Sequence, residues 1–339
     1  MKKFSLVLLS LFLLVSIVFT GCGKEKAPKD LILDSVKKSA EIKSSAFDGK
    51  IDITLDTKNL KGTQEELATL QMFNQMQIRL SGKQNVNPLQ FEGNLQAQMG
   101  GLSIDLPIIM KDNMLYVKIP AIAQPYIQDT TKQYISMDAT EFSKNTDPMK
   151  NSEESLKLVT SILNSLDEKA FVKEDVKNFA LTDGTEANAV SVVITKDNLK
   201  PFLQKFMVES LPLIMDQAQK SAVTDENKKQ LQQAKNDLTK NKAEIDKTIN
   251  EIDKYLTINT FKTTSVYDKE GFERKTVMTF DGIVNLDKEG SLGLKMNVEV
   301  NTKDINKEQK FEMTVPTKDQ TIDLQQLEKT QPYYLNNGN

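Results

Sequence analysis

The chain alternates between two hydrophobic periods, and their order predicts where strands and helices lie. From Phe47 to Asp56, apolar residues occupy every second position with polar residues between them, which is typical of a strand with one buried face. The same pattern recurs at 76–81, 89–99, 102–108, 114–119, 171–181, 189–195, 258–267, 272–286, 292–300 and 311–315. Strands of about ten residues exceed the usual five or six, so we expect one large curved sheet.

Short turns between these strands predict an antiparallel arrangement. Gly100-Gly101 and Lys111-Asp112-Asn113 separate neighbouring strands early in the chain, and Asp-Lys-Glu-Gly occurs twice, at 268–271 and 287–290. Carboxylates and a glycine in one loop also suit calcium, but neither copy approaches a calcium loop of about twelve residues. Hairpin turns with a left-handed glycine are therefore the preferred interpretation of both copies.

Between the strand runs, a period near 3.6 predicts helices. Residues 31–44, 152–166 and 201–220 each place their apolar side chains on one face, and Pro212 should kink the last of these helices. The order along the chain is helix, strands, helix, strands, helices, strands, which predicts an α+β fold with helices on one face of an antiparallel sheet. No compositional break divides residues 31–339, so we expect a single domain with a helical insertion at 197–256. Whether the strands form one sheet or two halves of similar design stays open.

Residues 224–256 form the most distinctive helical segment. Apolar residues recur there every seven positions among charged and amide side chains, which predicts an amphipathic helix of about 30 residues. These positions are Leu231, Leu238, Ile245 and Ile252. The d positions of a coiled coil hold Ala234, Asn241, Thr248 and Tyr255, which a two-stranded coiled coil would not favour. We therefore favour a helix that packs over the sheet by one narrow face.

The N-terminus has the three parts of a secretory signal. Lys2 and Lys3 precede a mostly apolar stretch at 4–19, and Thr20-Gly21-Cys22 follows. The tetrad at 19–22 resembles the lipobox of bacterial lipoproteins, although Phe19 stands where Leu is usual. A plain membrane anchor is the alternative, but sixteen residues fall short of the roughly 20 that a spanning helix needs.

This resemblance implies a signal peptide at 1–21 and a lipidated cysteine at Cys22. Residues 22–30 would then be a tether, with the protein anchored on the outer face of the cytoplasmic membrane. Two acyl chains of roughly sixteen carbons, the length of palmitate, would hold it there at about 0.8 kcal/mol for each buried CH₂.

The composition excludes several kinds of chemistry. The chain has no histidine, no tryptophan and one cysteine, so zinc and copper sites of the usual kind are excluded, as are Ser-His-Asp and Cys-His catalysis. Removing the two lysines of residues 1–21 moves the formal charge from -3 to -5, which does not suit nucleic acid. We therefore predict no enzymatic activity, no metal and no cofactor. A hydrolase built on carboxylates is a minor alternative. Its candidates Asp48, Asp52 and Asp56 lie on one strand with roughly 13 Å between successive residues, so they cannot form a close catalytic pair.

Methionines are frequent at the apolar positions of the predicted strands and helices. Examples are Met76, Met99, Met110, Met114, Met207, Met215, Met278, Met296 and Met313. Thioether side chains adapt to irregular partners, which suits a cavity for flexible acyl chains, but they also serve as ordinary core residues.

The arrangement as a whole resembles the lipoproteins grouped with LolA, LolB and the LppX/LprG type. The similarity lies in the lipobox, the entry helix into Ser39-Ala-Glu-Ile-Lys-Ser-Ser-Ala-Phe-Asp48, the long alternating strands, and Lys111–Lys118 followed by Tyr134-Ile-Ser-Met-Asp138. It implies a half-open antiparallel β-barrel covered by helices, with an apolar cavity for lipid. Tyr134 stands where a tryptophan is frequent, and the charged helix 224–256 looks like an insertion.

Two functions follow as hypotheses. The first is a membrane-anchored lipoprotein that binds a hydrophobic or amphiphilic ligand, a lipid or an acyl chain, between sheet and helices. The alternative is a non-catalytic envelope lipoprotein that docks a protein partner through helix 224–256. Both place the protein at the membrane through Cys22, and neither involves nucleic acid.

Overall fold

The computed structural model describes residues 27–127, 129–140, 148–181, 183–221, 225–324 and 326–327. The predicted signal peptide and Cys22 lie outside these residues. Within the described part of the chain, no helix is both long enough and apolar enough to cross a membrane.

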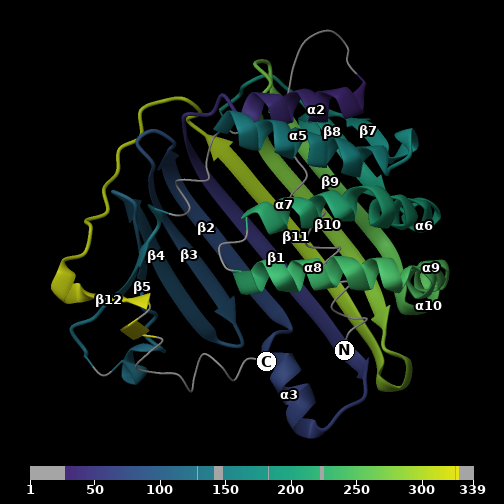
Figure 1. Ribbon diagram of the computed structural model, residues 1–339, viewed down its shortest axis with the longest axis horizontal. Coiled ribbons are helices and arrows are strands. Elements are labelled where there is room, and N and C mark those ends of the chain that lie inside the picture. The colour runs from purple at the N-terminus through teal and green to yellow at the C-terminus, as the bar shows by residue number, and fades with distance from the viewer. Residues whose placement is uncertain are drawn as a thin grey trace. The chain divides into compact units, whose positions relative to one another are not determined.

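Twelve strands form one open, curved sheet, which confirms the predicted α+β class and shows that the strands join a single sheet (Figure 1). Their order is β12-β6-β5-β4-β3-β2-β1-β11-β10-β9-β8-β7. β12 runs parallel to β6, and the sheet is otherwise mostly antiparallel. The strands are β1 Ser44–Leu60, β2 Gln75–Asn85, β3 Gln90–Met99, β4 Leu102–Lys111, β5 Met114–Lys118, β6 Tyr134–Asp138, β7 Phe171–Glu174, β8 Ala187–Ile194, β9 Leu256–Asp268, β10 Glu273–Asn285, β11 Gly290–Lys303 and β12 Thr321–Asp323.

The helices precede, interrupt and connect the strand runs. The α-helices are α2 Pro28–Ser39, α3 Gln64–Met72, α5 Pro148–Asn164, α6 Lys196–Lys205, α7 Leu211–Ser221, α8 Asp225–Lys240, α9 Lys242–Asn250 and α10 Ile252–Tyr255. The shorter helices are η1 Gln124–Tyr126, η2 Glu168–Ala170, η3 Val176–Phe179, the π-helix η4 Phe206–Ser210, η5 Asp287–Glu289 and η6 Lys318–Gln320.

The chain divides into two compact units. The first unit comprises Met1–Glu41, Asp52–Gln75 and Asp147–Asn301, and the second comprises Ile42–Ile51, Met76–Thr146 and Thr302–Asn339. The single domain expected for 31–339 stays a prediction.

In the first unit, helices cover one face of strands β8–β11 (Figure 1). Phe261 and Phe280 are cross-strand partners on this face, and their rings meet edge to face with centroids 6.0 Å apart. Phe202 and Phe206, from α6 and η4, are buried with their ring centroids 5.6 Å apart. The hydrophobic core of this unit therefore lies between the sheet and the helical layer.

Near Pro212, where a kink was expected, the structure shows a change of helix type. The predicted helix 201–220 is divided into α6, the π-helix η4 and α7. Proline supplies no backbone N–H and its ring crowds the preceding turn, so the α-helical hydrogen bonding is interrupted there. The wider turn buries the Ser210 hydroxyl, whose oxygen lies 2.9 Å from Ser161 Oγ and 3.2 Å from Ser165 Oγ.

Several predicted elements were wrong. The strand expected at 171–181 ends at Glu174, because the Asp175 side chain accepts a hydrogen bond from Lys177 N and starts the helix η3. Residues 311–315 join no strand, since the backbone N–H groups of Glu312 and Met313 donate to a side chain, Glu92.

The helix expected at 224–256 is three helices, with non-helical backbone at Asn241 and Glu251 between them. Asparagine is a poor helix former, which explains the first break. Helix α3 was not expected at all, although Thr63 and Glu66 form a capping box at its start.

The predicted turns are confirmed by backbone conformation. Asp112 and Asn113 have φ of 52° and 60°, and Gly271 and Gly290 have φ of 92° and 97°. At Gly290 a Cβ atom would also lie 2.0 Å from the carbonyl oxygen of Asn59. Glycine is therefore required there both by conformation and by the close approach of another strand.

Replacing Gly290 with Ala should lower the free energy of unfolding by about 2–3 kcal/mol, because strain at positive φ is joined by a backbone collision. Gly184→Ala is the matched control, since Gly184 has φ of 71° but no atom within 4 Å of the place that a Cβ would take. The control should lose only about 1 kcal/mol in urea unfolding. Equal losses in the two variants would contradict the close approach at Gly290.

Candidate functional site

The second unit carries a continuous apolar surface on one side of strands β2–β6, which we call the apolar face. The strands form an antiparallel meander, so the register places cross-strand partners in rows. The first row is Met76, Met99 and Leu102, and the third is Leu80, Leu95 and Leu106. The apolar face consists of Met76, Ile78, Leu80, Leu95, Ala97, Met99, Leu102, Ile104, Leu106, Ile108, Met110, Leu115, Val117, Ile135 and Met137.

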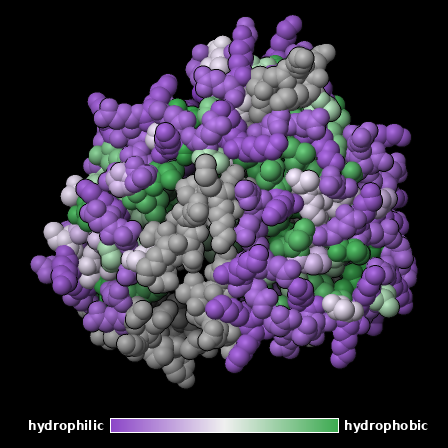
Figure 2. Space-filling model, turned by 45° about the horizontal axis from the view of Figure 1, so that its top comes forward, coloured by the Kyte–Doolittle hydropathy of each residue, from purple (hydrophilic) through white to green (hydrophobic). Residues whose placement is uncertain are grey.

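The side chains of the apolar face are only partly covered. None of the fifteen is buried, and Leu102 is 39% exposed. On the helix-covered face of the first unit, by contrast, apolar side chains are fully buried. Met278 and Phe280 are each only 1% exposed. Figure 2 shows, for one face of the molecule, that hydrophobic side chains reach the surface between hydrophilic ones. The apolar face thus retains apolar area that a further partner could cover.

An aromatic pair lies at one end of the apolar face along β1–β3. The rings of Phe47 and Phe91 are stacked, with centroids 6.0 Å apart and an interplanar angle of 24°. A Cβ atom on Gly82 would lie 2.9 Å from Phe47 Cζ, and one on Gly93 would lie 2.7 Å from Phe91 Cζ. The two rings therefore rest on a pair of glycines that are direct cross-strand partners.

A short sequence motif accompanies this arrangement of a phenylalanine ring over a glycine, and hydrophobic periodicity does not reveal it. Phe-acid-Gly occurs three times, at 47–49, 91–93 and 280–282. In the third copy the Phe280 ring lies over Gly282, with its Cζ 2.7 Å from where a Cβ would stand. This copy is buried in the first unit, whereas Phe47 and Phe91 are half-buried.

The opposite side of β2 and β3 is polar, and several of its side chains pair with one another or with neighbouring segments. Asp105 Oδ1 accepts hydrogen bonds from Asn94 Nδ2 at 2.7 Å and from Gln96 Nε2 at 3.1 Å. Glu92 is buried there, and its Oε2 accepts hydrogen bonds from the backbone N–H groups of Glu312 and Met313 at 2.7 and 2.8 Å. The part of the C-terminal segment at Glu312 and Met313 is thereby attached to this side of the strands.

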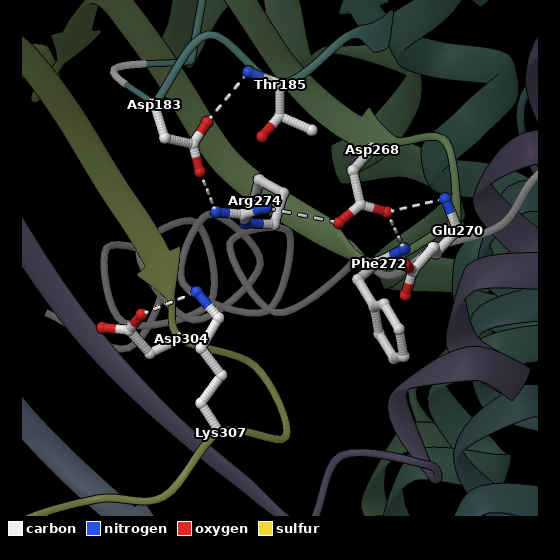
Figure 3. Close-up of polar contacts among 8 residues, drawn as sticks. All are labelled: Asp183, Thr185, Asp268, Glu270, Phe272, Arg274, Asp304 and Lys307. Atoms are coloured by element: carbon white, nitrogen blue, oxygen red, sulfur yellow. Dashed lines mark hydrogen bonds and ion pairs between the residues drawn. The ribbon is translucent and has the colours of Figure 1, made fainter.

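The charged side chain of Arg274, in the first unit, forms ion pairs with two aspartates. Arg274 Nη2 lies 2.7 Å from Asp183 Oδ2, and its Nη1 lies 3.4 Å from Asp268 Oδ2 (Figure 3). Hydrogen bonds from Thr185 and from Arg274 lower the pKa of Asp183. Asp268 Oδ1 in turn accepts from the backbone N–H groups of Glu270 and Phe272. This cluster ties the hairpin turn at 268–271 to the loop at 183–185.

The acidic residues considered for hydrolysis do not form a catalytic pair with each other. Asp48 Oδ1 lies 2.5 Å from Lys303 Nζ, and Asp56 Oδ2 lies 3.9 Å from Lys58 Nζ. Among the described residues, no group of three Asp, Glu, His or Cys side chains is placed to hold a metal ion.

The remaining sequence-predicted positions are spread over the fold. Met76, Met99 and Met110 lie on the apolar face, while Met114 points to the other side of β5. Met215, Met278 and Met296 are buried in the first unit, and Met313 is exposed. The apolar stripe of the segment 224–256 faces inward toward its C-terminal end, where Ile249 and Ile252 are buried.

Polar contacts join the helices α7 and α8. Gln219 Nε2 donates to Gln232 Oε1 at 3.2 Å, and Lys235 pairs with Asp216. Docking of a protein partner through this segment stays a prediction. In comparisons with known proteins, the chain matches no protein-family model, and no curated protein is significantly similar to it.

Proposed function

We propose that this chain is a membrane-anchored lipoprotein that binds the acyl chain of a lipid on the apolar face of its second unit. The observation that carries the proposal is the array of fifteen contiguous apolar side chains, none of which is buried. Covering apolar area yields about 25 cal/mol for each Å² removed from water, so such an array favours an apolar partner.

The dimensions and chemistry of the apolar face suit an acyl chain. Met76 to Leu80 spans four residue steps, or about 13 Å along the strand. That length is close to one leaflet of a bilayer, about 15 Å, which is the span of a phospholipid acyl chain. The face carries no charged side chain, and its methionines can adapt to a flexible ligand.

The membrane location rests on the N-terminal sequence. A lipidated Cys22 would be followed by a short segment before α2 begins at Pro28 and, at up to about 3.5 Å for each residue, this segment reaches roughly 20 Å. The folded part would then stay near the lipid surface. This arrangement agrees with the resemblance to the LolA and LppX/LprG-type lipoproteins, and it makes membrane lipid the nearest source of acyl chains.

The test uses the mature chain, residues 22–339, produced without its signal peptide and therefore not lipidated. We expect native mass spectrometry to show copurifying lipid, and a fluorescent fatty acid to bind. Leu95→Lys places a charge in the middle of the apolar face and should weaken fatty-acid binding by at least about tenfold, because a buried charge is strongly unfavourable.

Gln98→Lys is the matched control, since Gln98 is exposed on the opposite side of the same strand. It should bind like the wild type, with both variants folded by circular dichroism. Wild-type protein that carries no lipid and binds no fatty acid would refute the proposal.

A further inference from the structure

We infer that the aromatic pair, Phe47 and Phe91, closes one end of the acyl-chain track over β2 and β3 and thereby sets the chain length that binds. The inference rests on the proposed function, because it concerns the same apolar face. It assigns these two residues a role in specificity, as the contact for the methyl end of the chain.

The track along β2 and β3 has three aliphatic rows. They are Met76 with Met99, Ile78 with Ala97, and Leu80 with Leu95. The next row is Gly82 with Gly93, which offers no side chain, and the rings of Phe47 and Phe91 occupy the space above it. A chain lying over the aliphatic rows would therefore meet the aromatic rings once it passes the third row, which lies about 13 Å from the first.

Beyond the aromatic pair the track becomes polar. Gln84 is the cross-strand partner of Phe91, and its Nε2 donates a hydrogen bond to Ser45 Oγ at 3.0 Å. Ser45 is itself buried. An acyl chain extended past the rings would have to desolvate this amide without a hydrogen bond to offer it. The boundary is thus both steric and chemical.

The opposite end of the track is accessible. Leu102 completes the first row and is 39% exposed, and the uncharged turn Gly100-Gly101 connects the strands there. We therefore place the entrance at this end, with the lipid headgroup outside it.

The two glycines under the rings leave no room for another side chain. Each ring rests on a glycine where a Cβ would also stand 2.8 Å from a backbone oxygen, Glu92 O for Gly82 and Ser81 O for Gly93. No side chain could take the place of either ring at this row without moving the strands. The rings are nevertheless half-buried, so a ligand can touch them.

The test measures the binding of saturated fatty acids, from caprylic to arachidic acid, to the mature chain 22–339. For the wild type, affinity should rise with chain length to a maximum and then fall. In Phe47→Ala and Phe91→Ala the maximum should move to longer acids. The affinity for arachidic acid relative to palmitic acid should rise about tenfold, as expected for roughly two more buried methylenes.

Phe73→Ala is the control, because Phe73 lies at the end of α3, outside the apolar face, and is exposed. Its preference should match that of the wild type. Where an alanine variant fails to fold, Phe91→Leu and Phe91→Trp replace it, with preference expected to move to longer and shorter acids respectively.

The outcomes separate the two proposals. A wild type that binds none of these acids refutes the proposed function together with the length limit. Binding whose length preference is unchanged in the aromatic variants refutes the length limit alone and leaves the proposed function standing.

Discussion

We expect the free energy of unfolding of the wild type to fall between about pH 5 and pH 8, and replacing Glu273 with Gln should remove most of this fall. Glu273 is 4% exposed, and burial raises the pKa of its carboxyl from 4.5 to about 8. Hydrogen bonds from Thr276, whose Oγ1 lies 2.7 Å from Glu273 Oε1, and from Ser265 lower the pKa and only partly oppose this effect. The buried Tyr267 is its cross-strand partner.

The sign of the effect follows from where the proton is bound. Between pH 4.5 and about 8 the folded protein keeps the proton on Glu273, whereas the unfolded chain has released it. The free energy of unfolding therefore falls as the pH rises through this window, and it becomes independent of this group above it. A shift of this size corresponds to roughly 5 kcal/mol in total. Glutamine has nearly the same shape and no charge, so the variant should lack this fall.

Urea unfolding at pH 5, 6.5, 8 and 9 would measure the slope for both proteins. Glu270→Gln is the control, because Glu270 is an exposed glutamate in the neighbouring turn and its variant should keep the wild-type slope. If wild type and Glu273→Gln lost stability in parallel, Glu273 would not be held neutral by its surroundings.

Replacing Phe280 with Ala should lower the free energy of unfolding by about 3–5 kcal/mol, the range for truncating a buried phenylalanine. Its ring contacts Phe261 and lies over Gly282, so its removal leaves a cavity in the core of the first unit. Phe91→Ala is the natural comparison, because it changes the same motif in the second unit. Since Phe91 is half-buried, the loss should be less than half as large.

Urea unfolding monitored by circular dichroism would give both values. Similar losses for the two variants would mean that Phe91 is packed as completely as Phe280. The apolar face would then have no free area at this end, in conflict with the partial exposure of Phe91 in the structure.

Local patterns predicted much of the fold. The alternation along 89–99 and the turn at Lys111-Asp112-Asn113 lead directly to β3 and to the β4–β5 hairpin. These features depend on residues close together in sequence. The end of β7 and the path of the C-terminal segment depend instead on single polar side chains, Asp175 and Glu92. The period of the hydrophobic residues does not indicate which backbone N–H group such a carboxylate will bind.

The candidate site was predicted only in part for the same reason. Met76, Met99 and Met110 could be assigned to apolar positions of strands, but their arrangement in rows depends on register between strands. The aromatic pair depends on two strands bringing Gly82 opposite Gly93. The recurring Phe-acid-Gly motif was visible in the sequence, yet only the structure shows that the rings lie on glycines.

The two edge strands of the sheet, β12 and β7, affect its tendency to aggregate. The outermost strands, β12 and β7, have three and four residues, the shortest among the described strands. An exposed sheet edge offers unpaired N–H and C=O groups to another chain, and short edge strands limit this hazard. The two outermost strands thus offer a neighbouring molecule only a few backbone groups each. This arrangement disfavours edge-to-edge aggregation through β12 and β7.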